Sequence, residues 1–236
     1  IKPVDVTENE LRQLLPTSRF DLDEMMTNLR AILGTLEHPG MKALAASYLD
    51  DEALMQAFRR APAATTLHHA WIGGLLEHTL QLLTLADGML PRYPGLNRDL
   101  VLMGLFLHDL GKVWELSWER GFEYTTDGNL IGHIVRGTIV LEIKGMAARK
   151  HGLPREALRV LQHIVASHHG PVEFGSAKVP STPEAIFVAH LDNLDARTEM
   201  ALRAVDRDSE TPATGDFTER VWALDTRLYR PDPLKG

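Results

Sequence analysis

The sequence contains no cysteine among its 236 residues. Disulfides, thiolate nucleophiles and cysteine-bound zinc are therefore excluded, and any metal must be held by histidine and carboxylate side chains. No apolar run approaches the roughly 18 residues that a membrane span needs, and no signal-peptide pattern opens the chain. We therefore expect a cytoplasmic protein with no membrane partner.

Positive charge is also scarce, since the formal net charge is -7 at pH 7. This balance argues against a surface that coats nucleic acid, although it is compatible with a local basic groove leading to a metal site. Hydrophobic residues make up 44% of the chain, which is long enough for one large domain with a core of its own.

An apolar segment at residues 100–112 contains the adjacent pair His108-Asp109. A helix that is apolar on all sides lies inside its domain, so this imidazole and carboxylate should face inward. An unpaired buried carboxylate is strongly destabilising and is normally paired, protonated or bound to a metal. The pair is therefore either a buried His-Asp hydrogen bond or part of a metal site.

Helices are predicted on both sides of this segment from apolar periodicity, capping residues and turn residues. They cover residues 21–36, 39–60 with a possible break at Asp50-Asp51, 73–90, 97–109, about 129–150 after a turn at Asp127-Gly128, 154–168 and 181–207, with a short helix in 217–229. The helix at 181–207 opens with a capping box at residues 181–184. A small β-hairpin is predicted in 113–125, where apolar and polar residues alternate around Arg120-Gly121. Gly137 is expected to let another element approach closely.

The predicted architecture is all-α, a helical bundle with a small β-hairpin beside the metal site. We expect an N-terminal arm at residues 1–20, the main domain at 21–207, and a C-terminal tail at 208–236 whose short helix packs back. His68 and His69 fall in a predicted loop.

Several predicted helices carry a histidine or an aspartate within their apolar face. These inward polar residues are His78, His108, Asp109, His133, His168, His169 and Asp192. A single histidine on an apolar face is usually an ordinary core residue, but together these side chains would be difficult to satisfy without a cation. We therefore predict metal binding, and exclude His163 because it shares the other face with Arg159.

The predicted ligands suffice for two metals. Asp109, with its two carboxylate oxygens, is the natural bridge between a site of His78, His108 and Asp192 and a site of His133, His168 and His169. Imidazole and carboxylate suit Mn, Fe, Co, Ni or Zn. Metals about 3.5–4 Å apart activate a bridging water and stabilise the attacking and leaving oxygens of a phosphoryl displacement, so phosphoester hydrolysis is the favoured chemistry.

Asp109 and Lys112 are the predicted catalytic residues, and Lys112 and Arg136 the predicted substrate-binding residues. Lys112 lies one helical turn after His108, where it either neutralises a phosphate oxygen or faces solvent at a helix end. Arg136 opens the densest basic stretch, which either guides a phosphate backbone or forms a solvated helix face. The other members of that stretch are Lys144, Arg149, Lys150, Arg155 and Arg159.

His78, His108-Asp109 and Asp192 match the H…HD…D pattern of the HD-domain metal-dependent phosphohydrolases, and the chain resembles that family. From about residue 16 to 230 it is similar in particular to the YhaM-type 3′-to-5′ exoribonucleases. The phrases that carry this resemblance are GGLLEHT (73–79), HDLGK (108–112), DGNLIGHI (127–134), SHHGPVEFGS (167–176), TPEA (182–185) and HLDNLDA (190–196). It implies an all-helical HD domain that trims single-stranded RNA or DNA from the 3′ end with manganese or cobalt.

Members of that family carry an OB-fold domain upstream of the HD domain, and residues 1–20 supply none of its strands. Either such a domain precedes Ile1, or it is absent and the nucleic-acid substrate is in doubt. The GYP variant that hydrolyses cyclic dinucleotides does not match, because Pro171-Val172-Glu173-Phe174 follows the paired histidines.

Three functions remain open at this point. The first is an exonuclease, in which Trp114, Trp118, Phe122 or Tyr124 either stacks on the terminal base or packs in the core. The second is a phosphohydrolase of a nucleotide or another small phosphoester. The third is a regulatory module that binds a metal or a nucleotide without turnover. The oligomeric state is open as well, with a homo-oligomer among the alternatives.

Overall fold

The computed structural model describes residues 15–65, 70–119, 121–210 and 215–234, without the side chains of 207–210. Most of the predicted arm, together with His68, His69 and Arg120, lies outside these residues. The chain divides into two compact units, Ile1–Asp192 and Asn193–Gly236. The predicted domain limits at residues 20 and 207 remain predictions.

The first unit is a bundle of helices. Its helices are α2 (Leu22–Gly34), α3 (Pro39–Leu49), α4 (Glu52–Arg60), α5 (Gly74–Met89), α6 (Arg98–Leu107), α7 (Lys112–Glu115), α8 (Thr126–Leu130), α9 (Gly132–Ala148), α10 (Arg155–Ser167) and the start of α11 (Pro183–Glu210). In this unit, the strands of the described residues are β1 (Leu116–Ser117) and β2 (Glu123–Tyr124), which pair antiparallel. The prediction of an all-α fold with a small hairpin is confirmed.

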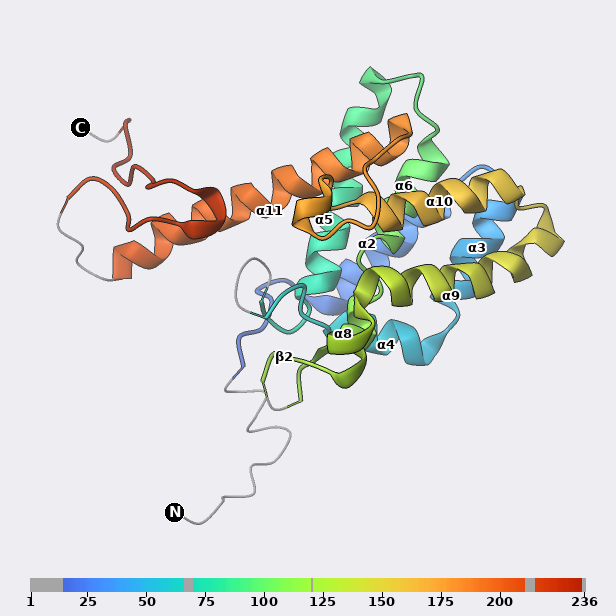
Figure 1. The fold of residues 1–236 in the computed structure, drawn as a ribbon, viewed down its shortest axis with the longest axis horizontal. Coiled ribbons are helices and arrows are strands. Elements are labelled where there is room, and N and C mark those ends of the chain that lie inside the picture. Colours follow the sequence, from blue (N-terminus) through green and yellow to red (C-terminus); the bar gives the residue numbers. More distant parts are fainter. Residues whose placement is uncertain (1–14, 66–69, 120, 211–214, 235–236) are drawn as a thin grey trace, which may run out of the picture. The chain divides into compact units, whose positions relative to one another are not determined.

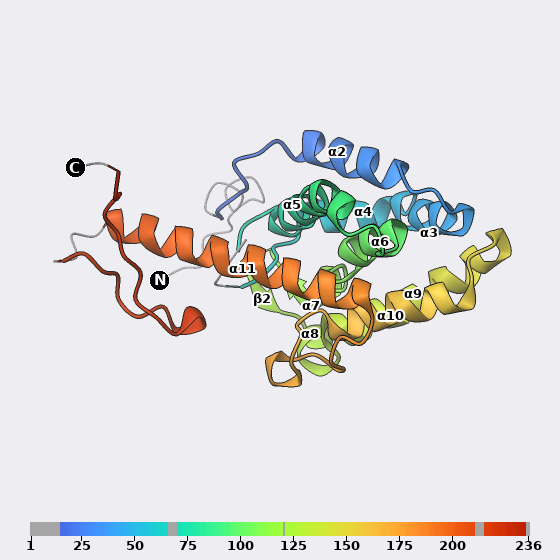
Figure 2. The same cartoon turned by 90° about the horizontal axis from the view of Figure 1, so that it is seen from above.

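The central position in this bundle belongs to α5 and α6. Figure 2 shows them between α2 on one side and α9 with α10 on the other. In Figure 1, α9 and α10 lie side by side, connected through the turn at Arg149–His151. The residues of α6 from 101 to 107 are buried on every side, so this helix carries its end, with His108 and Asp109, into the interior.

Side-chain caps fix where the helices begin. Asp21 Oδ1 accepts hydrogen bonds from two backbone N–H groups at the start of α2, and Asn97 Oδ1 accepts one from Leu100 at 3.1 Å. The capping box predicted at Ser181 is displaced by one residue, because Thr182 Oγ1 is the acceptor for α11. Glu184 Oε1 instead accepts the Asn97 N–H at 3.0 Å and so connects α11 to α6.

Two predicted boundaries are wrong near the hairpin. The hairpin is shorter than predicted, because Lys112–Glu115 forms the helical turn α7 before β1 begins. The turn predicted at Asp127-Gly128 lies inside α8, and the break falls later, at Gly132, which has φ +77°. This break shifts the helical phase, so Leu130 is exposed instead of sharing the buried face of α9.

The second unit contains α11 from Asn193 onward and an irregular tail. The predicted helix in 217–229 is wrong, since this stretch forms isolated β-bridges from Phe217 to Tyr229 and from Val221 to Thr226 around the 3-10 turn Trp222–Leu224. Its β-branched residues favour extended backbone over helix. Within the described residues, no helix combines the length and apolar composition that a membrane span requires.

Candidate metal centre

The predicted ligands converge in the interior of the first unit. His78 comes from α5, His133 from the first turn of α9, and Asp192 from α11. His108 and His168 follow the last residues of α6 and α10, with Asp109 and His169 next in the chain. The ligand atoms form two groups, each with atoms within 4.8 Å of one another: Asp109, His133, His168 and His169, and His78, His108 and Asp192.

Asp109 lies between the two groups, with one carboxylate oxygen toward each. Its Oδ2 is 3.5 Å from His108 Nε2 and 3.9 Å from His78 Nε2. Its Oδ1 is 3.4 Å from His168 Nε2 and 3.6 Å from His133 Nε2. A single buried carboxylate therefore faces both sets of imidazoles, as a bridging ligand would.

Asp192 provides the second carboxylate of the first group. Its Oδ1 is 3.2 Å from His78 Nε2 and 3.9 Å from His108 Nε2. Burial by itself would raise the pKa of Asp192, but the hydrogen bond from His78 and the nearby His108 lower it below its usual range. The carboxylate is therefore ionised in its buried position.

Hydrogen bonds at Nδ1 orient three of the histidines. His108 Nδ1 lies 2.7 Å from the Leu105 carbonyl oxygen, and His168 Nδ1 lies 2.8 Å from that of Val165. His133 Nδ1 lies 2.9 Å from Glu115 Oε1. A neutral imidazole that donates through Nδ1 keeps a lone pair at Nε2. All three rings thus direct Nε2 lone pairs toward Asp109.

These atoms fit a bound cation. Five of them have no hydrogen-bond partner among the residues described: His108 Nε2, Asp109 Oδ1, His133 Nε2, His168 Nε2 and His169 Nδ1. Lone pairs and carboxylate oxygens that face one another at these distances repel unless a positive charge lies between them. Burial lowers the pKa of His168, and burial together with the neighbouring His168 lowers that of His169 to about 3, so the charge does not come from these rings. Imidazole nitrogen and carboxylate oxygen are donors that suit a divalent transition metal.

Lys112 is an internal cation next to the ligands. Its Nζ lies 2.6 Å from Asp109 Oδ2, and its side chain is only 12% exposed. Burial opposes charge on both partners, yet the ammonium of Lys112, with His108, holds the pKa of Asp109 well below its usual range. Asp109 in turn raises the pKa of Lys112 despite its burial. Lys112 does not face solvent, which was one of the two alternatives for it.

Arg136 and the rest of the basic stretch are engaged locally. Arg136 forms a bidentate pair with Asp127, with its Nε 2.8 Å from Oδ2. Lys144 Nζ binds Asp51 at 2.9 Å, and Arg159 pairs with Glu156. These contacts distribute the positive side chains among separate partners and do not support one continuous phosphate groove. His163 lies apart from the centre, where its Nε2 accepts the Ser181 N–H at 2.8 Å.

Two residues of the centre were not predicted from the sequence. Glu115 holds His133, and the hydrogen bonds from His133 overcome burial to lower the pKa of Glu115. Gly111 packs against the backbone of His133, since a Cβ on Gly111 would lie 2.0 Å from the His133 carbonyl oxygen. Their closeness to the HD pair in sequence was the available signal.

Similarity to known proteins identifies the family. The HD domain family matches residues 75–197, a range that includes every ligand candidate from His78 to Asp192. The chain is 39% identical over 235 residues to the 3′-5′ exoribonuclease YhaM of Bacillus pumilus, covering 98% of this chain and 71% of that protein. The chain belongs to the YhaM family of HD-domain proteins. Membership makes it a metal-dependent hydrolase.

Further YhaM proteins are similar over the same extent. The relative from Bacillus subtilis is 37% identical over 233 residues, which cover 98% of this chain and 71% of the relative. The relative from a Geobacillus species is 39% identical over 218 residues, covering 92% of this chain and 64% of the relative. These YhaM proteins are therefore longer than the present chain. No solved structure matches it.

Proposed function

We propose that the protein is a metal-dependent phosphodiesterase that shortens single-stranded RNA from its 3′ end, with DNA as a further substrate. The observation that carries this proposal is Asp109, whose two oxygens face two groups of imidazoles in a chain of the YhaM family. The relatives named 3′-5′ exoribonuclease YhaM supply the substrate class.

We assign one metal position to His78, His108 and Asp192 and the other to His133, His168 and His169, with Asp109 shared between them. Manganese is our first choice, and cobalt, iron, nickel and zinc suit the same donors. A metal pair bound there supplies Lewis-acid activation of water and stabilisation of the phosphate oxygens.

The chain itself supplies charge and orientation beside the metal positions. Lys112 holds a permanent ammonium within 2.6 Å of Asp109. In this position it can neutralise a non-bridging phosphate oxygen or the leaving oxygen as charge develops there. Arg136 lies one helical turn after His133 and has about a third of its side chain exposed, so it can bind a phosphate further along the strand by exchanging Asp127 for it.

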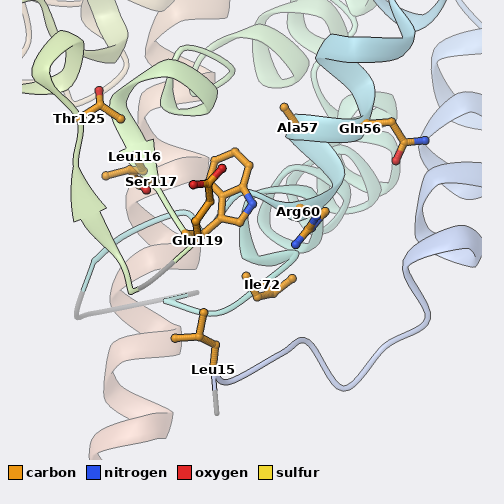
Figure 3. Close-up of a pocket in the computed structure, with 10 residues that line it drawn as sticks. Leu15, Gln56, Ala57, Arg60, Ile72, Leu116, Ser117, Glu119 and Thr125 are labelled. Atoms are coloured by element: carbon orange, nitrogen blue, oxygen red, sulfur yellow. The ribbon is translucent and has the colours of Figure 1, made fainter. Parts of the chain in front are cut away.

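A pocket of about 480 Å³ beside the hairpin is a candidate for a base of the strand. Figure 3 shows Arg60 and Gln56 of α4 across from Leu116 and Ser117 of β1. Trp118 also lines this pocket, and an indole face stacks on any base. We therefore favour Trp118 over Trp114, Phe122 and Tyr124 as the stacking residue.

The test is a time course on 5′-labelled single-stranded RNA with added Mn²⁺, run beside the Asp109→Ala variant and a panel of nucleotides. We expect a descending ladder of products with the wild type, and intact RNA with Asp109→Ala. Intact RNA with phosphate release from a nucleotide would contradict the exonuclease and identify a small-molecule phosphohydrolase. Mn²⁺ binding without turnover of any substrate would indicate a regulatory module.

Three wider features belong to the same proposal. An OB-fold domain that precedes this sequence would raise affinity for the strand, consistent with the greater length of the YhaM relatives. A cytoplasmic location is expected for an enzyme that acts on RNA. A homo-oligomer would be detected by the mass of the protein in solution.

A further inference from the structure

We infer that Glu115 is a positioning residue that orients His133 toward the metal position shared by Asp109, His168 and His169. This inference rests on the metal centre proposed above. It concerns a residue that contacts a ligand and not the metal, so its effect should reach one metal position and leave the other unchanged.

Glu115 makes two hydrogen bonds to His133 through one oxygen. Its Oε1 accepts the backbone N–H of His133 at 3.0 Å and the ring Nδ1–H at 2.9 Å. The Glu115 side chain is 11% exposed and the His133 side chain 12%, so water competes little for these contacts. Together the two bonds fix the ring rotation and the tautomer, which leaves the Nε2 lone pair directed at Asp109.

The position of His133 explains why it needs an external partner. His108 and His168 donate Nδ1–H to carbonyls three residues earlier in their own helices, at Leu105 and Val165. His133 is the second residue of α9, and the helical conformation is interrupted at Gly132. The carbonyl three residues before His133, that of Leu130, therefore belongs to α8 and not to α9. An acceptor from another element therefore takes the hydrogen bond from Nδ1–H, and this acceptor is the carboxylate of Glu115.

Glu115 is itself held in place by its neighbours. Its carbonyl oxygen accepts the Thr125 N–H at 2.9 Å. Gly128 packs on the same carbonyl, since a Cβ there would lie only 2.2 Å from it. The carboxylate therefore starts from a fixed backbone, and its charge increases the basicity of the His133 ring as a ligand.

The experiment is a calorimetric titration of Mn²⁺ alone into the full chain, with Glu115→Ala, Glu115→Gln and the control Glu123→Gln. Glu123 is an exposed residue of β2, so its variant removes a carboxylate from the hairpin that follows α7 without touching the centre. We expect Glu115→Ala to lower the affinity for one of two Mn²⁺ ions by about 10–100-fold, which is the usual effect of losing a hydrogen-bond partner of a ligand. Glu115→Gln should lose less, because an amide oxygen still accepts both hydrogen bonds.

A double-variant cycle separates positioning from a general structural effect. Once His133→Ala has removed the ligand, adding Glu115→Ala should cause no further loss of Mn²⁺ affinity. The inference would be overturned if Glu115→Ala lowered the affinity for both Mn²⁺ ions equally or left Mn²⁺ binding unchanged. It would also be overturned if the losses of affinity in the two single variants added up in the double variant. A wild type that binds no Mn²⁺ would instead contradict the metal centre itself. Circular dichroism of each variant identifies any that fails to fold, and Glu115→Gln then carries the test.

Discussion

Replacing Gly111 with alanine should destabilise the protein, although backbone preference alone predicts the opposite. Gly111 has φ -58° and ψ -20°, a helical conformation that suits alanine. A glycine-to-alanine change at a compatible position stabilises by about 0.4–1 kcal/mol. Here, however, the new Cβ would lie 2.0 Å from the His133 carbonyl oxygen and 2.7 Å from its carbonyl carbon. Both are backbone atoms, so no side-chain rotation relieves the overlap.

The size of the effect follows from these opposing contributions. Overpacking costs about 1–3 kcal/mol, and a contact this short with backbone belongs at the upper end. The net loss should therefore be about 2 kcal/mol in the free energy of unfolding. The backbone that must move carries His133, and a displacement of about 1 Å can reduce activity on the order of 100-fold. We expect weaker Mn²⁺ binding to accompany the loss of stability.

The assay is urea denaturation of the chelator-treated protein, so that metal binding does not contribute, followed by Mn²⁺ titration. Gly137→Ala is the matched control on the facing side of the same contact. The sequence suggested a close approach at Gly137, but a Cβ there would meet nothing nearer than Val165 Cγ1 at 3.5 Å, an ordinary contact. Gly137→Ala should therefore be neutral or stabilising. If Gly111→Ala is as stable as Gly137→Ala, the packing argument is wrong.

Three further predictions follow from the described contacts. Removing Mn²⁺ with a chelator should lower the free energy of unfolding of the wild type by about 2.7 kcal/mol, compared with protein in Mn²⁺ at 100 times its Kd. The same treatment should have little effect on Asp109→Ala. Arg136→Ala should raise the KM for RNA by about tenfold while calorimetry shows unchanged Mn²⁺ affinity. Asp51→Asn should destabilise by no more than about 1 kcal/mol at pH 7, because the hydrogen bond from Lys144 lowers the pKa of Asp51 in the folded state. A carboxylate with a lowered folded pKa stabilises above its unfolded pKa, about 3.9, and loses this contribution as pH falls. The difference between wild type and Asp51→Asn in urea denaturation should therefore disappear in acid.

Several candidate ligands could be predicted from the sequence because they interrupt or directly follow an apolar face. His78 lies among buried leucines of α5, and Asp192 follows buried Val188 along α11, so helical periodicity alone turns both inward. The apolar sequence of α6 likewise predicts that the His108-Asp109 pair at its end is buried. Periodicity works here because these helices run for ten residues or more and present a repeated pattern.

Short elements could not be predicted in this way, because they contain too few residues to show a repeated pattern. The turn α7 contains four residues, too few to show a helical period, and its Val113 and Trp114 are residue types typical of a strand. The break before α9 depends on the left-handed backbone of Gly132, which a continuous apolar pattern does not reveal. Glu115 and Gly111 lie in or beside these elements, so their contacts with His133 required three-dimensional coordinates.

The segment 109–115 shows why spacing matters as much as identity in this centre. Asp109 faces both groups of imidazoles, Lys112 neutralises it from three residues later, and Glu115 reaches His133 from three residues beyond that. Residues three apart in a helical turn lie on the same face, so Lys112 and Glu115 both face the candidate metal centre. Gly111, between Asp109 and Lys112, lets α9 approach closely enough for Glu115 to reach His133. Inserting one residue after Gly111 would rotate Lys112 and Glu115 by about 100° around the helix axis, which would separate both from their partners while leaving every ligand in the sequence.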